Sequence, residues 1–227
     1  MIDQIKFDFI KNKYGYWGSW AIWADEGEKP KSNVGDLSVF DNKALLEKLN
    51  PNIILVGLNI SRGSIKVPLA NFHDARSEAT DYKIRYALKD TPLWGGYMTD
   101  IIKDYDEKSS TKVVDYLKVN KSFEEQNVSF FREEMKDLGA ANPTIVAFGR
   151  DAYNILKKHF KSDVNILKIP HYANYTSKEK YREEVISICK DSAREIPSLR
   201  FEKSKFLPRW LSCLVFRIQQ MHPKQGS

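Results

Sequence analysis

Short apolar runs alternate with helix-like segments along most of the chain. Each run is rich in branched side chains and closed by turn residues, which is typical of strands buried in a parallel sheet. This alternation predicts an α/β fold, with three αβα layers around a central, mostly parallel, four-stranded sheet. The predicted strands are 52–57, 93–102, 144–148 and 164–169. The helices predicted between and after them are 82–89, two within 110–138, one that carries Tyr153, Leu156 and Phe160, and one from Thr176 or Ser177 to about Cys189.

The part of the chain before the first strand is less regular. Residues 3–12 predict a short amphipathic helix, and Asp41 is a suitable N-cap for a helix that carries the leucines of 45–49. Between them lies an aromatic segment, 14–23, which alternates like a strand with a bulged start. Aromatic side chains at this density usually pack against a sheet edge, and the stacking of nucleobases is the alternative.

Length and composition suit one globular domain with a short extension. The 227 residues are 42% hydrophobic and 29% charged, and we divide them into an α/β domain at 1–191 and a C-terminal extension at 192–227. No apolar run approaches the roughly 18 residues that span a membrane, and the first residues lack the apolar core of a signal peptide. The two cysteines are too few for a disulfide framework. We therefore expect a cytoplasmic monomer.

The positive charge is concentrated in the extension. The formal net charge is +6, and residues 192–227 hold seven Lys or Arg against two Glu. The domain itself is therefore close to neutral. A strongly basic surface is the usual mark of a nucleic-acid-binding protein. Because the positive charge here lies mainly in the extension, the overall charge is only weak support for that function.

Three loops are expected to meet at one edge of the sheet, because the carboxyl ends of parallel strands lie on the same side. They are 57–63, 97–104 and 170–175. Gly57 and Gly63 flank Asn59 in the first loop, so the backbone can turn sharply and a ligand can approach closely. Together with Phe72, the loops supply an amide, a carboxylate, an imidazole and an aromatic face.

These residues resemble the motifs of the uracil-DNA glycosylase superfamily, in order and in approximate spacing, from residue 52 to about 190. Gly57-Leu58-Asn59-Ile60 looks like the Gly-x-Asn-Pro motif of its mismatch-specific and single-strand-selective branches. The segment 97–103 is similar to the central strand Tyr-x-Thr-Asn-x-x-Lys, and 171–175 falls where the family has His-Pro-Ser-Pro followed by a wedge residue. Each motif alone is a weak signal, and their shared order makes the resemblance more specific.

The resemblance implies a role for each matching residue. Asn59 would position the attacking water and His171 would stabilise the departing base, while Gly57 and Leu58 would line the substrate pocket. Phe72 would stack on a flipped base, Asp100 would read its edge, and Tyr175 would fill the gap left in the duplex. Basic residues near these loops are the expected DNA contacts. They are Arg62, Lys66, Arg76, Lys103 and Lys178.

The departures from the family pattern concern specificity. Ile60 replaces the motif's proline, and Asp100 stands where the family reads uracil with asparagine. An ionised carboxylate only accepts hydrogen bonds, so it would favour a base with an exocyclic amino group over uracil. A buried, protonated Asp100 is the second hypothesis, and a helix cap or ion-pair partner is the structural alternative. The four cysteines of the iron–sulfur branches are absent, so we expect no metal and no cofactor.

Three functions are compatible with these residues. The first is a monofunctional DNA glycosylase that removes a uracil-like or modified base, in repair or in defence against modified foreign DNA. The second is a non-catalytic module of the same fold that binds a nucleic acid or a nucleotide. The third is a hydrolase or transferase of small N-glycosides, which would need no wedge at Tyr175. The combination of Asn59 and His171 favours an enzyme.

Overall fold

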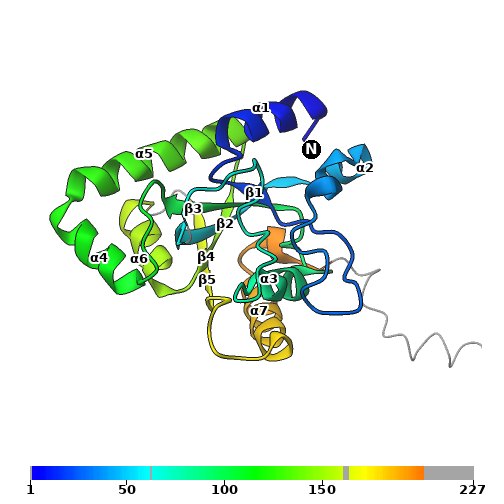
Figure 1. Cartoon of the computed structure of the whole chain (residues 1–227). Coiled ribbons are helices and arrows are strands. Elements are labelled where there is room, and N and C mark those ends of the chain that lie inside the picture. The colour runs from blue at the N-terminus through cyan, green and yellow to red at the C-terminus, as the bar shows by residue number, and fades with distance from the viewer. Residues whose placement is uncertain (1, 62, 161–163, 202–227) are drawn as a thin grey trace, which may run out of the picture.

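The computed structural model describes residues 2–61, 63–160 and 164–201 (Figure 1). Its sheet has five strands in the order β1-β3-β2-β4-β5, in which β1 pairs antiparallel with β3 and the other neighbours are parallel. The strands are β1 Ser19–Trp20, β2 Asn50–Asn59, β3 Gly96–Ile102, β4 Thr144–Phe148 and β5 Asn165–Ile169. The α-helices are α1 Gln4–Tyr14, α2 Lys43–Leu46, α3 Asp81–Leu88, α4 Ser110–Val119, α5 Lys121–Leu138, α6 Arg150–His159 and α7 Lys178–Ser192. Two short 3-10 helices are η1 Leu37–Asp41 and η2 Pro197–Leu199.

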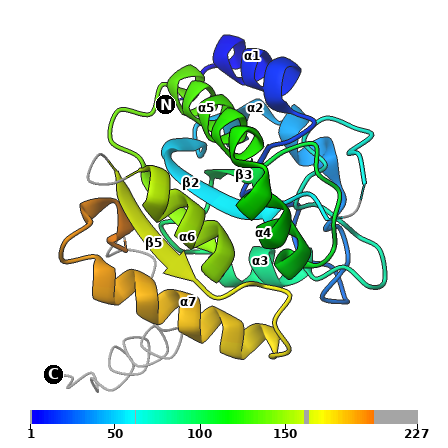
Figure 2. The same cartoon turned by 90° about the vertical axis from the view of Figure 1, so that its left-hand side faces the viewer.

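The sheet lies between two layers of helices. Helices α1, α4, α5 and α6 cover one face, and α3 and α7 pack side by side on the other (Figures 1 and 2). Successive residues of β2 point to opposite faces, so Ile54 and Val56 enter one core while Ile53 and Leu55 enter the other. A strand that is buried on both faces reads as a continuous apolar run, which explains why β2 and β4 are visible in the sequence.

Most of the predicted elements are present, and the α/β class is confirmed. The number of strands was wrong, because the aromatic segment 14–23 contributes the two-residue edge strand β1. The capping prediction was also wrong. Asn42, not Asp41, caps α2, since its side chain accepts the N–H of Ala44 at 3.0 Å. Of the two candidates for α7, Ser177 is the cap and accepts the N–H of Lys180 at 3.2 Å.

The domain continues beyond residue 191. Helix α7 ends at Ser192, and the following turn brings Leu199 into the core beneath α3 and α7, where it is fully buried. The part of the predicted extension after residue 201 lies outside the described residues. In the described part of the chain, every helix is too short or too polar to cross a membrane.

Candidate functional site

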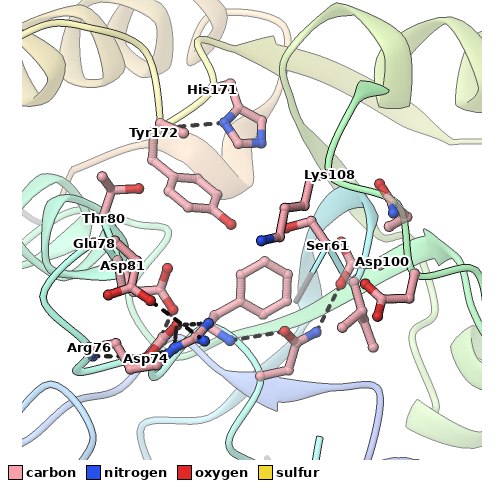
Figure 3. A pocket seen from close by; sticks show the side chains of 17 residues that line it. Ser61, Asp74, Arg76, Glu78, Thr80, Asp81, Asp100, Lys108, His171 and Tyr172 are labelled. Atoms are coloured by element: carbon pink, nitrogen blue, oxygen red, sulfur yellow. Dashed lines mark hydrogen bonds and ion pairs between the residues drawn. The ribbon is translucent and has the colours of Figure 1, made fainter. Parts of the chain in front are cut away.

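A cavity of about 530 Å³ opens at the carboxyl edge of the parallel strands (Figure 3). Residues from all three predicted loops line it, together with Phe72, so the expected convergence of the loops is confirmed. His171 and Tyr172 lie at one end, Asp100 lies across from them, and the segment from Asp74 to Asp81 forms a third side. Segments far apart in the sequence thus place an amide, a carboxylate and an imidazole around one space.

Asn59 ends β2, and its side-chain amide has a fixed orientation. The amide nitrogen Nδ2 donates to the backbone carbonyls of Tyr105, at 3.0 Å, and Glu107, at 2.8 Å. Both hydrogens of Nδ2 are therefore used within the protein. The other polar atom of the amide is Oδ1, which can only accept a hydrogen bond. Asn59 accordingly offers an acceptor to a ligand in the cavity.

His171 follows β5 and offers the opposite polarity. Its Nδ1 accepts the backbone N–H of Ala173 at 3.1 Å, so the hydrogen of a neutral ring resides on Nε2. Burial lowers the pKa of His171 and outweighs the opposing effect of the Asp151 carboxylate. The ring also stacks on Tyr172 with centroids 4.5 Å apart. His171 is therefore a neutral, oriented hydrogen-bond donor at neutral pH.

Phe72 provides an aromatic wall of the cavity in an uncommon backbone conformation. Its φ is +65°, a region that bulky residues seldom occupy, so the surrounding contacts must hold it there. Its N–H donates to Oδ1 of Asn71 at 3.1 Å, and its carbonyl accepts from the indole of Trp23 at 3.3 Å. The ring packs 6.1 Å from that of Phe148. Phe72 is thus both a core residue and a wall of the cavity.

Asp100 lies on the penultimate paired position of β3, opposite Gly57 of β2. It is 4% exposed, and its Oδ2 accepts from Nδ2 of Asn71 at 2.9 Å. A Cβ atom at position 57 would lie 2.2 Å from Oδ1 of Asp100 and 3.5 Å from the Phe72 ring. Glycine is therefore required at 57 because the Asp100 carboxylate occupies the space of a side chain.

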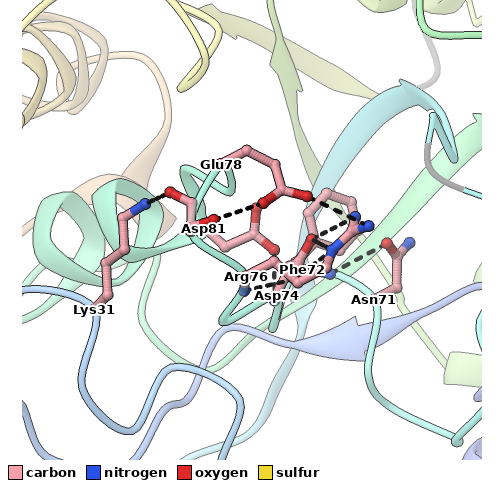
Figure 4. A network of polar contacts seen from close by, with 8 residues as sticks. Lys31, Asn71, Phe72, Asp74, Arg76, Glu78 and Asp81 are labelled. Carbon is pink, nitrogen blue, oxygen red and sulfur yellow. Dashed lines mark hydrogen bonds and ion pairs between the residues drawn. The ribbon is translucent and has the colours of Figure 1, made fainter.

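The third side of the cavity is a compact set of charged groups on the loop before α3 (Figure 4). Arg76 holds Asp74 with hydrogen bonds from Nε and Nη2, the latter at 2.9 Å, and lies 3.6 Å from Glu78. Asp81 begins α3 and accepts the N–H of Asp74 at 2.8 Å. Lys31 donates to the backbone carbonyl of Ser77 and ties the loop to the segment before η1. These contacts order the loop that closes the cavity.

The cavity has a second, adjoining lobe of about 730 Å³. The two lobes share Asn59, Asp100, His171 and Tyr172, among others. We call the first the acidic lobe, because the described residues of its lining include five carboxylates, of Asp74, Glu78, Asp81, Asp100 and Asp106, and two basic side chains, of Arg76 and Lys108. We call the second the basic lobe, because its lining includes Lys108, Arg150 and Lys168 against Asp100 and Asp151. Gly57 and Leu58 line the basic lobe, and Leu58 is otherwise buried in the core.

The expected role of Lys103 as a DNA contact was wrong. The residue is 4% exposed, and its Nζ lies 3.0 Å from Oε2 of the fully buried Glu134. It also donates to the hydroxyl of Thr99 at 3.1 Å and to the backbone carbonyl of Asp100 at 2.6 Å. Burial of its charge in this network prevents contact with a phosphate. Lys103 instead fixes the backbone that carries Asp100.

The other expected DNA contacts are only partly available at the surface. Lys66 is exposed, and Arg62 lies outside the described residues. Arg76 is exposed but is held by Asp74, and Lys178 lies 3.3 Å from Glu26 and over the ring of Tyr86. Tyr175 is fully exposed in the loop after β5. The local acidic partners reduce the net positive charge that these residues present.

Several residues of the site were not predicted. Asn71 orients both Phe72 and Asp100, Tyr172 stacks on His171, and Asp81 anchors the loop before α3. Only Tyr172 had a local signal, since it follows His171 directly. Among the described residues, no group of three or more His, Cys, Asp or Glu side chains is arranged to hold a metal ion. Comparisons of the chain with family models, with curated proteins and with solved structures find no match.

Proposed function

We propose that the protein is a monofunctional DNA glycosylase, which hydrolyses the bond between a base and its sugar after the base has left the stack. The observation that carries the proposal is the pairing of Asn59 and His171 in one cavity. Contacts within the protein restrict Asn59 to accepting and His171 to donating. Hydrolysis of an N-glycosidic bond needs one group of each kind.

Asn59 supplies the acceptor for the nucleophile. Its Oδ1 accepts a hydrogen from water and turns a lone pair of that water toward C1′ of the sugar. The water oxygen then forms a bond to C1′, and the electron pair of the breaking C1′–N bond moves onto the base. The proton of the water passes to solvent or to the departing base. No covalent bond between protein and sugar is needed.

His171 supplies the donor for the leaving group. The departing base carries negative charge, which collects on its oxygen or nitrogen atoms. An Nε2–H fixed in a partly dry site stabilises that charge more strongly than water does. The neutral ring fits its surroundings, because Nδ1 keeps the lone pair that accepts the N–H of Ala173 while Nε2 keeps the hydrogen that it donates.

The shape of the site also supports a flipped base. Phe72 and Tyr172 offer aromatic surfaces to a base in the acidic lobe, and Tyr175 is exposed two residues after Ala173, which lines both lobes. Lys108, Arg150 and Lys168 line the neighbouring basic lobe, where a backbone phosphate finds positive charge. The residues that resemble motifs of the uracil-DNA glycosylase superfamily fall on these same loops and add support from the sequence.

A panel of oligonucleotides tests the proposal. Each carries one uracil, 5-hydroxymethyluracil, hypoxanthine or modified cytosine, and alkali-labile abasic sites are scored in single and double strands. We expect abasic sites on at least one substrate and a loss of about 100-fold or more in Asn59→Ala. Asn154→Ala is the matched control, because Asn154 is an exposed residue of α6 that does not line the cavity. The absence of abasic sites on every substrate would instead favour the binding module.

A further inference from the structure

We infer that Lys83 is a positioning residue, which holds the turn after β5 so that the His171 ring keeps one orientation and one tautomer. The inference rests on the proposed function for the role of His171, and it adds the residue that holds this group in place. Lys83 lies on α3 and lines neither lobe of the cavity. It therefore acts on the site through the turn and not by contact with a substrate.

Lys83 is a buried cation whose position is not explained by the needs of α3 itself. The residue is 7% exposed and lies in the first turn of the helix, where the helix dipole disfavours a positive charge. Its Nζ donates to the backbone carbonyls of Asn174, at 3.1 Å, and Thr176, at 2.8 Å. Since a buried charge is costly unless hydrogen bonds compensate for it, these two bonds are what the ammonium contributes. They stabilise the turn after β5.

The backbone that Lys83 holds is the same backbone that orients His171. The N–H of Ala173 donates to Nδ1 of His171 at 3.1 Å, and the N–H of Asn174 donates to the His171 carbonyl at 3.0 Å. Asn174 is thus bonded to His171 through its N–H and to Lys83 through its carbonyl. A shift of Asn174 away from α3 would also move the neighbouring N–H of Ala173, which selects the tautomer of the ring.

The turn is anchored at both ends. At its start, the hydroxyl of the buried Tyr181 donates to the carbonyl of Pro170 at 3.1 Å. At its end, Lys83 holds the carbonyls of residues 174 and 176, directly before the Ser177 cap of α7. Loss of the Lys83 ammonium should therefore loosen the part of the turn that follows His171, while Pro170 stays in place.

Arg182 provides a matched control on the same pair of helices. It lies on α7, and its Nη1 donates to the backbone carbonyls of Ala87, at 3.3 Å, and Lys89, at 2.7 Å, at the C-terminal end of α3. Lys83→Met and Arg182→Met each replace a cation that donates to backbone carbonyls where α3 packs against α7 and the turn before it. Only Lys83→Met removes a contact with the turn that carries His171.

Nitrogen-15 NMR of the histidine rings tests the inference without a substrate, and the spectrum of His171→Phe assigns the signals. At pH 8 the ring is neutral, because burial lowers the pKa of His171 below its ordinary value of 6.5. In the wild type, we expect the chemical shift of an unprotonated nitrogen at Nδ1 and that of a protonated nitrogen at Nε2. In Lys83→Met, the two shifts should move toward each other, because the released ring exchanges between tautomers. Arg182→Met should keep the wild-type shifts.

The rate of base release is the second readout, measured in single turnovers at saturating enzyme on a substrate that the wild type cleaves. We expect Lys83→Met to be about tenfold slower or more, because a small displacement of the donor from the leaving group is costly. Arg182→Met should stay within about twofold of the wild type. Binding of the oligonucleotide should change by less than about twofold in both variants, since neither side chain lines the cavity.

The outcomes separate this inference from the proposed function. Unchanged His171 shifts in Lys83→Met, or an unchanged rate of base release, overturn the inference and leave the glycosylase intact. Equal changes in Arg182→Met also overturn it, because they would reflect a general loosening of α3 against α7. Altered shifts in Lys83→Met alone support the hold on His171, and the absence of base release by the wild type then contradicts the glycosylase.

A measurement on the wild-type chain decides the matter if Lys83→Met does not fold. Hydrogen bonds to two carbonyls in a buried place should slow the exchange of the Lys83 ammonium protons with water, so that NMR detects them. The exposed Lys180 of α7 is the internal reference. Exchange at Lys83 as fast as at Lys180 would overturn the inference.

Discussion

Replacement of Lys103 by methionine is expected to destabilise the fold strongly. Lys103 and Glu134 are 4% and 0% exposed, and their charged groups lie 3.0 Å apart. Methionine fills most of the space but leaves the Glu134 carboxylate buried. Among the described residues, the Tyr97 hydroxyl, at 2.6 Å, is then its one strong donor. Breaking a buried ion pair in this way costs about 3–5 kcal/mol. For a chain of this size, that corresponds to a fall in Tm of roughly 6–20 °C.

Urea unfolding followed by tryptophan fluorescence measures the loss, because the chain has five tryptophans. The matched control is the double variant Lys103→Met/Glu134→Gln, in which no charge is left unpaired and Tyr97 keeps an acceptor. We expect the double variant to be more stable than Lys103→Met alone. A loss below about 1 kcal/mol in Lys103→Met, or a double variant at least as unstable as the single one, would refute the reasoning.

Three further predictions concern the cavity. Gly57→Ala places a methyl group 2.2 Å from Oδ1 of Asp100 and is expected to destabilise the fold by about 1–3 kcal/mol. The base-release activity should fall by more than this loss of folded protein explains. Unchanged activity would contradict the close approach of Asp100 to Gly57. Burial lowers the pKa of His171 below its ordinary value of 6.5, so the imidazole binds a proton more readily in the unfolded chain than in the folded protein. The free energy of unfolding should therefore decrease as the pH falls below 6.5. Urea unfolding at pH 5 and 7.5 should therefore show a smaller pH dependence in His171→Phe. Tyr175→Ala should change the free energy of unfolding by less than about 0.5 kcal/mol, because the side chain is fully exposed. It should slow the cleavage of duplex DNA more than that of single strands, while Tyr175→Phe should retain activity. An equal effect on both substrates would argue against a wedge.

The parts of the fold that the sequence predicted are those with a strong local signal. Strand β4 was predicted at its observed bounds, because an apolar run lies between Pro143 and Gly149. The edge strand β1 has only two residues, so its alternation carries almost no information. The error at Asp41 has a similar origin, since Asp41 and Asn42 are adjacent and both are good caps.

The site residues were predictable where a side chain follows a buried strand. Asn59 is the last residue of β2 and His171 follows β5, and the parallel sheet brings them together. Burial is less visible in the sequence. From the sequence alone, Lys103 is expected to be a charged surface residue, because nothing in the sequence connects it with its partner Glu134 on α5. Asn71 lies in a long segment without periodicity, and only the structure connects it to Asp100.

The most direct test of the central claim is the mass-spectrometric detection of both reaction products. Under single-turnover conditions, we predict that the wild-type chain releases free base and abasic strand in equal amounts from a modified oligonucleotide. Asn59→Ala should release about 100-fold less in the same time, and Asn154→Ala should match the wild type. Release that is unaffected by Asn59→Ala, or no release from any substrate of the panel, would contradict a water held by Asn59 as the basis of the reaction.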